Sequence, residues 1–391
     1  MQVRACDPQR GRAPEGRPAV KGTILSLIGA AFLASCGVAP AQTGTVGKES
    51  GPLFPVVQNG KWGYINSSGL IVIEPQFAGV EDKETLMMLA LRGPGIIAAP
   101  MFPHVESFAE GLTAVQDGKS GKWGYIDKTG DMVIQPQFDK AYGFSEGLAA
   151  VVAGKKYGYI DKTGATVIKP QYDYGVAFSE GLARITIGEK YGFIDKTGAM
   201  VIKPNLDWAW SFSEGLVAAH QGGFKKGKSG YIESKFGYMD KAGQWVIEPR
   251  FALAGHFSEG LAAVRVGFGG CGYIDKTGNM VINPEFEGSV ESFHEGLAPA
   301  KVKVGGKWGY IDKTGATVIK PQYDPGVAFS EGLAGVSIGK KYGYIDKTGN
   351  MVIKPQFDSA GNFSGGLAAI KVGGKLGYID KTGKYVWEPQ Q

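Results

Sequence analysis

Short runs of apolar and β-branched residues recur along the chain and predict β-strands. In the stretch 147–180, an apolar run at 148–152 precedes a glycine-lysine turn, and a second run follows at 157–161. Side chains alternate within the second run, so that Tyr157 and Tyr159 share one face. These two runs predict neighbouring antiparallel strands.

A tight turn and a third strand complete the unit. Asp161 stands first and Gly164 fourth in the next tetrad. Aspartate accepts hydrogen bonds from the backbone ahead of it and glycine takes positive φ, so this tetrad predicts a type I turn with a bulge. The β-branched run 166–168 follows, and Pro170, which has no backbone N–H, ends the strand. Each unit is therefore predicted to be a three-stranded antiparallel meander plus a connecting segment over 171–180, with a fourth short strand in that segment as the alternative.

The unit is repeated along the chain. Its most regular mark is an aromatic residue followed by glycine, and the underlying period is 34 residues, as from Gly124 to Gly158 and from Gly343 to Gly377. A fixed period of this size is typical of repeat architectures. Nine copies begin at Trp62, Trp123, Tyr157, Tyr191, Phe236, Cys271, Trp308, Tyr342 and Leu376.

The repeat predicts an all-β fold. Three short strands bury little apolar surface, so each unit needs neighbours to cover its face. We expect a tandem array of about nine three-stranded antiparallel units, with the glycine of each pair letting the adjacent unit approach closely. An open curved stack is favoured, because the chain begins and ends on the same strand of the unit and leaves none to complete a sheet. A closed, propeller-like ring is the alternative.

The array is expected to occupy 53–391, with two interruptions. The first insertion lies at 76–99, and the second, at 223–234, resembles a partial duplication of the Gly-Lys-x-Gly-Tyr-Ile phrase. Insertions in repeat proteins map to loops, so both are expected at one edge of the array.

The amino terminus has the form of an export signal. The run 23–34 is uncharged and largely apolar, follows a basic segment, and is too short to span a bilayer comfortably. It ends in the sequence 33–37, which resembles the lipobox of bacterial lipoproteins. That resemblance implies a signal peptide over 1–36, cleavage before Cys36 and a lipid on its thiol. The small, polar stretch 37–52 is then expected to be a flexible tether.

Plain secretion is the alternative for export. The residues before Ala41 also fit a small-x-small cleavage site, which would leave a secreted or periplasmic protein. Only Cys36 and Cys271 remain after the leader, and an unpaired Cys36 is easiest to understand if lipid occupies it. We favour a lipid-anchored protein of the cell envelope, for which the outer membrane is a candidate location.

The charge pattern gives no indication of a nucleic-acid partner, and none is expected. The net charge is +5, but residues 1–35 hold five basic and two acidic residues, which leaves +2 for the rest of the chain. Lysines and carboxylates alternate within the repeats and form no basic block or stripe.

Four phrases of the unit together resemble the bacterial WG-repeat proteins. They are the aromatic-Gly pair at Trp308, the Tyr-Ile-Asp turn at 310–312, the Val-Ile-x-Pro step at 318–321 and the Phe-x-Glu-Gly-Leu-Ala phrase at 329–334. The resemblance covers nearly all of 53–389. It implies a β-rich protein, commonly exported or part of a multidomain chain, with no shared catalytic residues. The chain departs from the pattern at Cys271, Leu376 and Gly365.

Two motifs resemble known phosphorylation or phosphate-binding motifs. Asp-Lys-Thr-Gly resembles the phosphorylation phrase of P-type ATPases, but here it recurs and is never followed by threonine, so a turn is the better reading. The sequence 222–229 matches a phosphate-binding loop, yet a β phrase follows where that loop needs a helix, which favours chance. The seven repeated aspartates are Asp127, Asp161, Asp195, Asp275, Asp312, Asp346 and Asp380.

No catalytic, metal or cofactor constellation emerges. The four histidines stand at non-equivalent positions without metal-ligand spacing. Cys271 takes the place of an aromatic and is expected to be a buried small hydrophobe. A glutamate repeats before Gly-Leu and is expected to shape the adjacent turn rather than line a surface. It stands at Glu146, Glu180, Glu214, Glu259, Glu295 and Glu331.

The first aromatic of each pair forms the one candidate ligand surface. If exposed, this ladder would stack sugars, as in the choline-binding repeats that Gly-Lys-Trp-Gly-Tyr superficially resembles; if buried, it would be inter-repeat core. Core is favoured because the position accepts Cys271 and Leu376. The ladder comprises Trp62, Trp123, Tyr157, Tyr191, Phe236, Trp308 and Tyr342.

The functional hypothesis follows from the leader and the array. We expect an exported, lipid-anchored and monomeric repeat protein that acts as a non-catalytic scaffold, binding an unknown protein or a cell-wall or surface glycan. It would contact the membrane through lipid on Cys36. The alternatives are a structural spacer without a ligand and, with weaker support, an enzyme whose site lies in the 76–99 insertion.

Overall fold

The structure is a computed structural model that describes 51–78, 107–222, 225–226, 232–233, 235–267, 269–286, 290–301, 306–324 and 326–390. The chain divides into the units Met1–Pro40 and Ala41–Gln391, and every described residue belongs to the second. The predicted signal peptide with Cys36, most of the tether and the part 79–99 of the first insertion lie outside the described residues.

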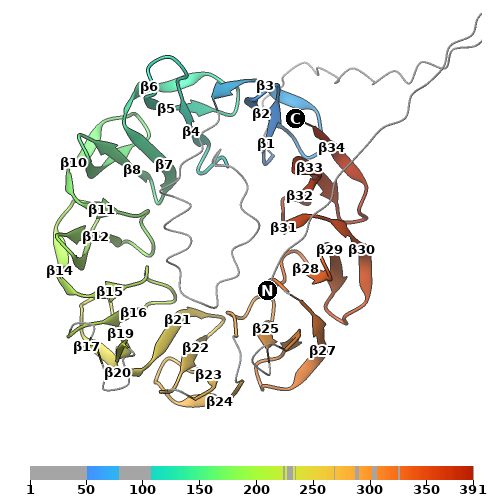
Figure 1. Ribbon diagram of the computed structural model, residues 1–391. Coiled ribbons are helices and arrows are strands. Elements are labelled where there is room, and N and C mark those ends of the chain that lie inside the picture. Colours follow the sequence, from blue (N-terminus) through green and yellow to red (C-terminus); the bar gives the residue numbers. More distant parts are fainter. Residues whose placement is uncertain are drawn as a thin grey trace, which may run out of the picture. The chain divides into compact units, whose positions relative to one another are not determined.

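The described residues form nine small antiparallel sheets, here called blades 1 to 9 (Figure 1). A separate two-stranded hairpin, β17 (Lys225–Lys226) with β18 (Ile232–Glu233), lies in the expected second insertion. The blades are blade 1, β1 (Phe54–Gln58), β2 (Lys61–Ile65) and β3 (Ile71–Ala78); blade 2, β4 (Leu112–Gln116), β5 (Trp123–Asp127) and β6 (Met132–Phe138); blade 3, β7 (Lys140–Ser145), β8 (Leu148–Ala153), β9 (Lys156–Asp161) and β10 (Thr166–Tyr172); blade 4, β11 (Tyr174–Gly175), β12 (Ala183–Ile187), β13 (Lys190–Ile194) and β14 (Met200–Leu206); blade 5, β15 (Trp208–Ala209), β16 (Val217–His220), β19 (Phe236–Met239) and β20 (Trp245–Phe251); blade 6, β21 (Leu253–Ser258), β22 (Leu261–Arg265), β23 (Cys271–Ile274) and β24 (Met280–Phe286); blade 7, β25 (Ala298–Lys301), β26 (Trp308–Ile311) and β27 (Thr317–Tyr323); blade 8, β28 (Leu333–Ile338), β29 (Lys341–Asp346) and β30 (Met351–Phe357); and blade 9, β31 (Ser359–Ser364), β32 (Leu367–Val372), β33 (Lys375–Asp380) and β34 (Tyr385–Gln390).

The predicted all-β tandem array is confirmed, with one addition to the unit. Consecutive strands pair antiparallel, as β8 does with β9 and β9 with β10. In blades 3, 4, 5, 6 and 9 the connecting segment supplies a fourth strand that precedes the predicted three. The register shifts within the last pair of strands, where the proline interrupts the ladder.

The glycine of the aromatic-glycine pair serves a purpose other than the predicted one. A Cβ placed on Gly158 would lie 2.5 Å from the Ile168 carbonyl oxygen and 2.6 Å from the Pro170 nitrogen. Both atoms belong to the last strand of the same blade. The glycine therefore lets the irregular strand cross closely within its own blade, and it is not there for the adjacent unit.

The blades close into a ring, as the alternative arrangement proposed, and the open stack favoured from the sequence is wrong. The first and last blades lie side by side (Figure 1). The Tyr378 hydroxyl donates to the Pro55 carbonyl over 2.9 Å, and the Tyr378 ring lies 5.5 Å from Phe54. One apolar cluster joins Phe54 and Trp62 to Leu376. No shared strand is required, because blades meet face to face through side chains.

An equivalent contact between two rings recurs at the other seams, and in blade 4 the first ring is Phe193, which has no hydroxyl. In blade 3 the buried Tyr159 packs its ring against Phe178 of blade 4, with centroids 5.0 Å apart. Its hydroxyl donates to the Val176 carbonyl over 2.8 Å. A buried tyrosine both fills apolar space and needs a partner for its hydroxyl, so it fixes how neighbouring blades sit. Fully buried tyrosines at this second aromatic position are Tyr64, Tyr125, Tyr159, Tyr238, Tyr273, Tyr310 and Tyr344.

Candidate functional site

Each blade has two ends of different character. In blade 3, Leu148 pairs with Asp161 at one end, where the Glu-Gly and Asp-Lys-Thr-Gly turns lie. At the other end Val152 pairs with Tyr157, next to the hairpin between the second and third strands. We call these the turn end and the hairpin end.

At the turn end the repeated aspartate holds its own turn together. Asp161 Oδ1 accepts from the Thr163 backbone N–H over 2.9 Å and from the Ala165 N–H over 3.1 Å. The hydrogen bond from the Thr163 hydroxyl and these amides lower the pKa of Asp161. The carboxylate is therefore engaged by the turn, in agreement with the reading of Asp-Lys-Thr-Gly as a turn.

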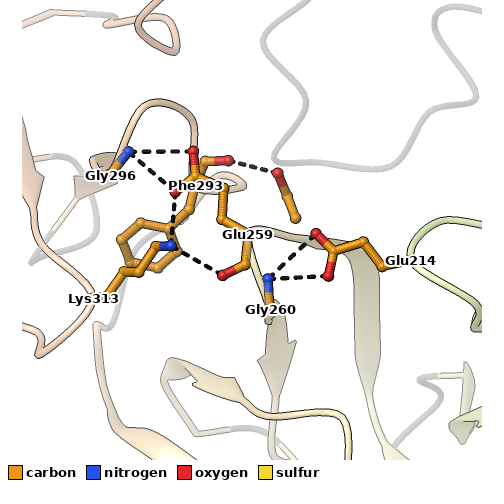
Figure 2. Close-up of polar contacts among 7 residues, drawn as sticks. Glu214, Glu259, Gly260, Phe293, Gly296 and Lys313 are labelled. Carbon is orange, nitrogen blue, oxygen red and sulfur yellow. Dashed lines mark hydrogen bonds and ion pairs between the residues drawn. The ribbon is translucent and has the colours of Figure 1, made fainter.

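The repeated glutamate links one blade to the next. Figure 2 shows Glu259 of blade 6 accepting from the Gly296 N–H of blade 7, at 3.1 and 3.3 Å, while Lys313 Nζ lies 2.9 Å from its Oε2. Burial acts to raise the pKa of Glu259, but Lys313 and the Gly296 amide outweigh it and lower the pKa. The expectation that this residue only shapes its own turn was incomplete. We call the seven residues the carboxylate belt: Glu110, Glu146, Glu180, Glu214, Glu259, Glu295 and Glu331.

The belt is absent at the two seams that blade 1 forms, and the departure at Gly365 is explained at the closing seam. Blade 9 has Gly365 in place of the glutamate, and blade 1 has Ser67 in place of the lysine. A Cβ on Gly365 would lie 2.6 Å from Pro52 Cγ, so a side chain does not fit. At the seam between blades 1 and 2, Gly51 stands in place of the glutamate, and Lys128 of blade 2 donates to the Gly51 carbonyl over 2.7 Å.

The aromatic ladder lies at the hairpin end, on the third or middle strands of the blades. Trp62, Phe236 and Trp308 are buried, and the other members are half-buried. Cys271 and Leu376 are buried at the same register. The ladder contributes mainly to the packing between strands and blades, and it forms no continuous exposed platform.

One seam carries a cluster of aromatic residues of which the sequence analysis had singled out only Tyr191. Strand register places Tyr174, Thr186 and Tyr191 side by side on blade 4. Trp208 approaches from blade 5, with its ring centroid 5.4 Å from that of Tyr191 and an interplanar angle of 52°. These side chains, with Lys190, border an open cavity of about 470 Å³. We call Tyr174, Tyr191 and Trp208 the aromatic site.

Arg184 underlies the aromatic site. Its guanidinium carbon lies 5.3 Å from the Tyr191 ring centroid and 6.0 Å from that of Tyr174. Arg184 Nη1 donates to the carbonyl of Ala209 in blade 5. Its cross-strand partner is Phe193, which stands where other blades have the hydroxyl-bearing tyrosine. The arginine therefore supplies the cross-blade hydrogen bond that phenylalanine cannot make.

Further rings extend the aromatic site on both sides. Tyr157 of blade 3 lies 5.2 Å from Tyr174, and Trp210 lies 5.7 Å from Trp208. The Trp210 indole N–H donates to the carbonyl of Ala254 in blade 6 over 3.1 Å. The sequence signal for the aromatic site was the residue type at one repeated position. Tyr174 and Trp208 begin the inner strand where other blades have residues such as Lys140, Leu253 and Ser359.

The other features of the described residues give weaker indications of a functional site. A second cavity of about 450 Å³ lies between blades 1 and 2, bordered by Gln76, Phe77, Gln116 and Gln135. Across the described residues, no group of three or more His, Cys, Asp or Glu side chains is placed to hold a metal ion. That part of the chain also contains no helix with the length and hydrophobicity of a bilayer span.

Comparison with known proteins relates the repeats to one family. The family described as WG containing repeat matches this chain at 62–82, 123–157, 157–191, 191–223, 236–267, 272–308, 308–342 and 342–375. Comparison with curated proteins gives no match.

One solved structure shares the fold at low identity, and two others show a weaker likeness. A crystal structure of the eukaryotic initiation factor is 11% identical, with a TM-score of 0.58 over 87% of this chain and 97% of that one. The computationally designed Ika8 protein is 13% identical (TM-score 0.43; 75% and 99% covered), and BamB from Moraxella catarrhalis is 11% identical (TM-score 0.43; 71% and 93% covered). At these identities the likeness concerns the fold alone.

Proposed function

The chain belongs to the WG containing repeat family, and from this premise we propose that it is a non-catalytic binding scaffold whose ligand, a protein or a glycan, docks at the aromatic site. The observation that carries the proposal is the open cavity of about 470 Å³ beside Tyr174, Tyr191 and Trp208. Half-buried aromatic rings joined to a few polar groups are typical of ligand sites. The closed ring of blades holds these side chains in place.

Lipid anchoring belongs to the same proposal. The apolar run 23–34 and the sequence around Cys36 support export followed by lipid attachment to the cysteine. The protein would then present its ring outside the cytoplasm, tethered by 37–52, as a monomer. Metabolic labelling with a clickable fatty acid tests this: label is expected on the wild type and absent from Cys36→Ser. Equal labelling of the two would contradict the anchor.

Trp208→Leu tests the binding site. Leucine is the residue that blade 6 has at the equivalent position, Leu253, so the fold tolerates it. We expect the variant to lose at least tenfold in the capture of its partner in glycan-array and pull-down measurements with the full chain, because the indole face is lost. The melting temperature should fall by no more than a few degrees.

Leu253→Ala is the matched control. It removes an exposed apolar side chain from the same register position one blade further on. Capture should be unchanged in this variant. Unchanged capture by Trp208→Leu, or an equal loss in both variants, would contradict the proposed site and would favour a structural spacer.

A further inference from the structure

The recognition chemistry of the aromatic site can be specified from its charges and its packing. Resting on the proposed function, we propose that the aromatic site binds an uncharged sugar residue, and that Arg184 is the positioning residue that sets this specificity.

The walls of the cavity suit a sugar ring. Tyr174 and Tyr191 stand two strands apart with Thr186 between them, so their rings flank a hydroxyl on one face of blade 4. Trp208 closes the cavity from blade 5. A sugar presents an apolar face of C–H groups and a rim of hydroxyls, and half-buried rings bordered by polar groups match both parts.

The charges of the cavity are already balanced within the protein. Lys190 Nζ pairs with Asp207 Oδ1, and the same pairing recurs in other blades as Lys156 with Asp173 at 2.5 Å and Lys341 with Asp358 at 2.6 Å. This ion pair is therefore part of the repeat and is not specific to the aromatic site.

Arg184 excludes a cationic ligand. Three aromatic rings around a cavity could otherwise form a cage for a quaternary ammonium group. Here the guanidinium already lies within 6.0 Å of two of the rings, Tyr174 and Tyr191, and would repel a second cation. An acidic ligand gains little, because Arg184 is engaged by the Ala209 carbonyl and the cavity also holds the carboxylates of Asp207 and Glu189.

Arg184 is unusual for its position. The equivalent residues of the other blades are small, for example Ala150, Ala218, Ala263 and Gly335. An arginine fits in blade 4 because Phe193, its cross-strand partner, lacks the tyrosine hydroxyl that reaches the next blade elsewhere. The exchange leaves the seam linked and places a fixed positive charge beneath the two tyrosine rings.

Tryptophan fluorescence and NMR titrations of the full chain test the specificity. The probes are neutral oligosaccharides from a glycan array, an oligosaccharide of uronic acids, and tetramethylammonium. We expect saturable binding of at least one neutral sugar, lost in Trp208→Leu and at least tenfold tighter than binding of the other two probes. Comparable or tighter binding of the uronate or tetramethylammonium would overturn the inference, as would the absence of saturation by every neutral sugar.

The double variant Arg184→Ala/Phe193→Tyr isolates the role of the arginine. It gives blade 4 the small residue and the tyrosine of its neighbours, so the seam should stay linked. We expect it to bind tetramethylammonium at least fivefold more tightly than the wild type. Unaltered selectivity would overturn the role of Arg184.

Failure of this inference is distinguishable from failure of the proposed function. If a protein partner is captured in a Trp208-dependent manner while no sugar binds, the scaffold proposal stands and the sugar specificity is wrong. If Trp208→Leu keeps every interaction of the wild type, the aromatic site itself is wrong.

Discussion

The turn ends and the hairpin ends of the blades use the same repeat in opposite ways. At the turn end the contacts recur almost unchanged, as when Glu259 bridges to Gly296 and Lys313, and Glu295 to Gly332 and Lys347. At the hairpin end a lysine–aspartate ion pair also recurs, but the aromatic residues beside it differ from blade to blade, and one seam gathers Tyr174, Tyr191 and Trp208. Uniform contacts therefore assemble the ring, whereas a departure from the repeat forms the aromatic site, where we propose that a ligand binds.

The largest expected effect is the loss of stability when the buried seam tyrosine is replaced by alanine, compared with the same replacement at the ladder position two residues before it. Tyr344→Ala should lower the free energy of unfolding by about 3–5 kcal/mol, because a buried ring packed on Phe363 and a hydroxyl bonded to the Gly361 carbonyl are both lost. Tyr342→Ala, at the half-buried ladder position, should cost about 1–2 kcal/mol. Chemical denaturation measures both, and equal losses would remove the distinction between the two positions.

A middle-sized effect concerns the exceptional seam. Arg184→Ala should destabilise the protein by about 1–2 kcal/mol, because the Ala209 carbonyl loses its charged donor. Adding Phe193→Tyr should recover most of that loss, since a tyrosine here is expected to reach the Trp210 carbonyl, as Tyr159 reaches Val176. Thermal and chemical denaturation of the two variants measure the recovery. A double variant as unstable as Arg184→Ala would show that the two exchanges do not compensate.

The smallest effect concerns the carboxylate belt. Glu259→Gln should cost about 1 kcal/mol or less at neutral pH, because Lys313 loses an ion-pair partner that is partly exposed. The pKa of Glu259 is lower in the folded protein than in the unfolded chain, so its stabilising contribution is present at neutral pH and is lost as the pH falls.

The stability difference between the wild type and Glu259→Gln should therefore shrink below about pH 4. Denaturation midpoints at pH 7 and pH 3 measure it. Glu285→Ala, on an exposed position of β24, is the control and should change neither midpoint appreciably. A difference that grows in acid would contradict the sign of the linkage.

Much of the fold could be predicted because each unit repeats its own local signals. The turn at Asp161 and Gly164 depends on neighbouring residues, and the structure has it where the sequence indicated. The expectation that Pro170 ends the third strand is wrong: β10 runs on to Tyr172, and the missing proline N–H is accommodated by a shift of register between Ile168 and Tyr172. The role of Gly158 was misread, because the strand that approaches it is fixed by a register shift between β9 and β10.

The candidate site was harder to predict. The sequence reading selected the first aromatic of each pair because it repeats, and repetition is typical of packing. The aromatic site instead depends on residues that do not repeat, such as Tyr174 and Trp208. Tyr191 was selected, but its pairing with Trp208 of the next blade requires knowledge of how blades face one another.

The sequence by itself determined the three repeated strands of each unit, the Asp-Gly turns and the number of blades, because these arise from contacts within about 34 residues of the chain. Only the tertiary structure decided that the array closes, since closure depends on contacts of Tyr378 with Phe54 and Pro55, which lie at the opposite end of the array in the sequence. It also decided which side chains share a cavity, because the packing of blade 5 against blade 4 is what brings Trp208 against Tyr191.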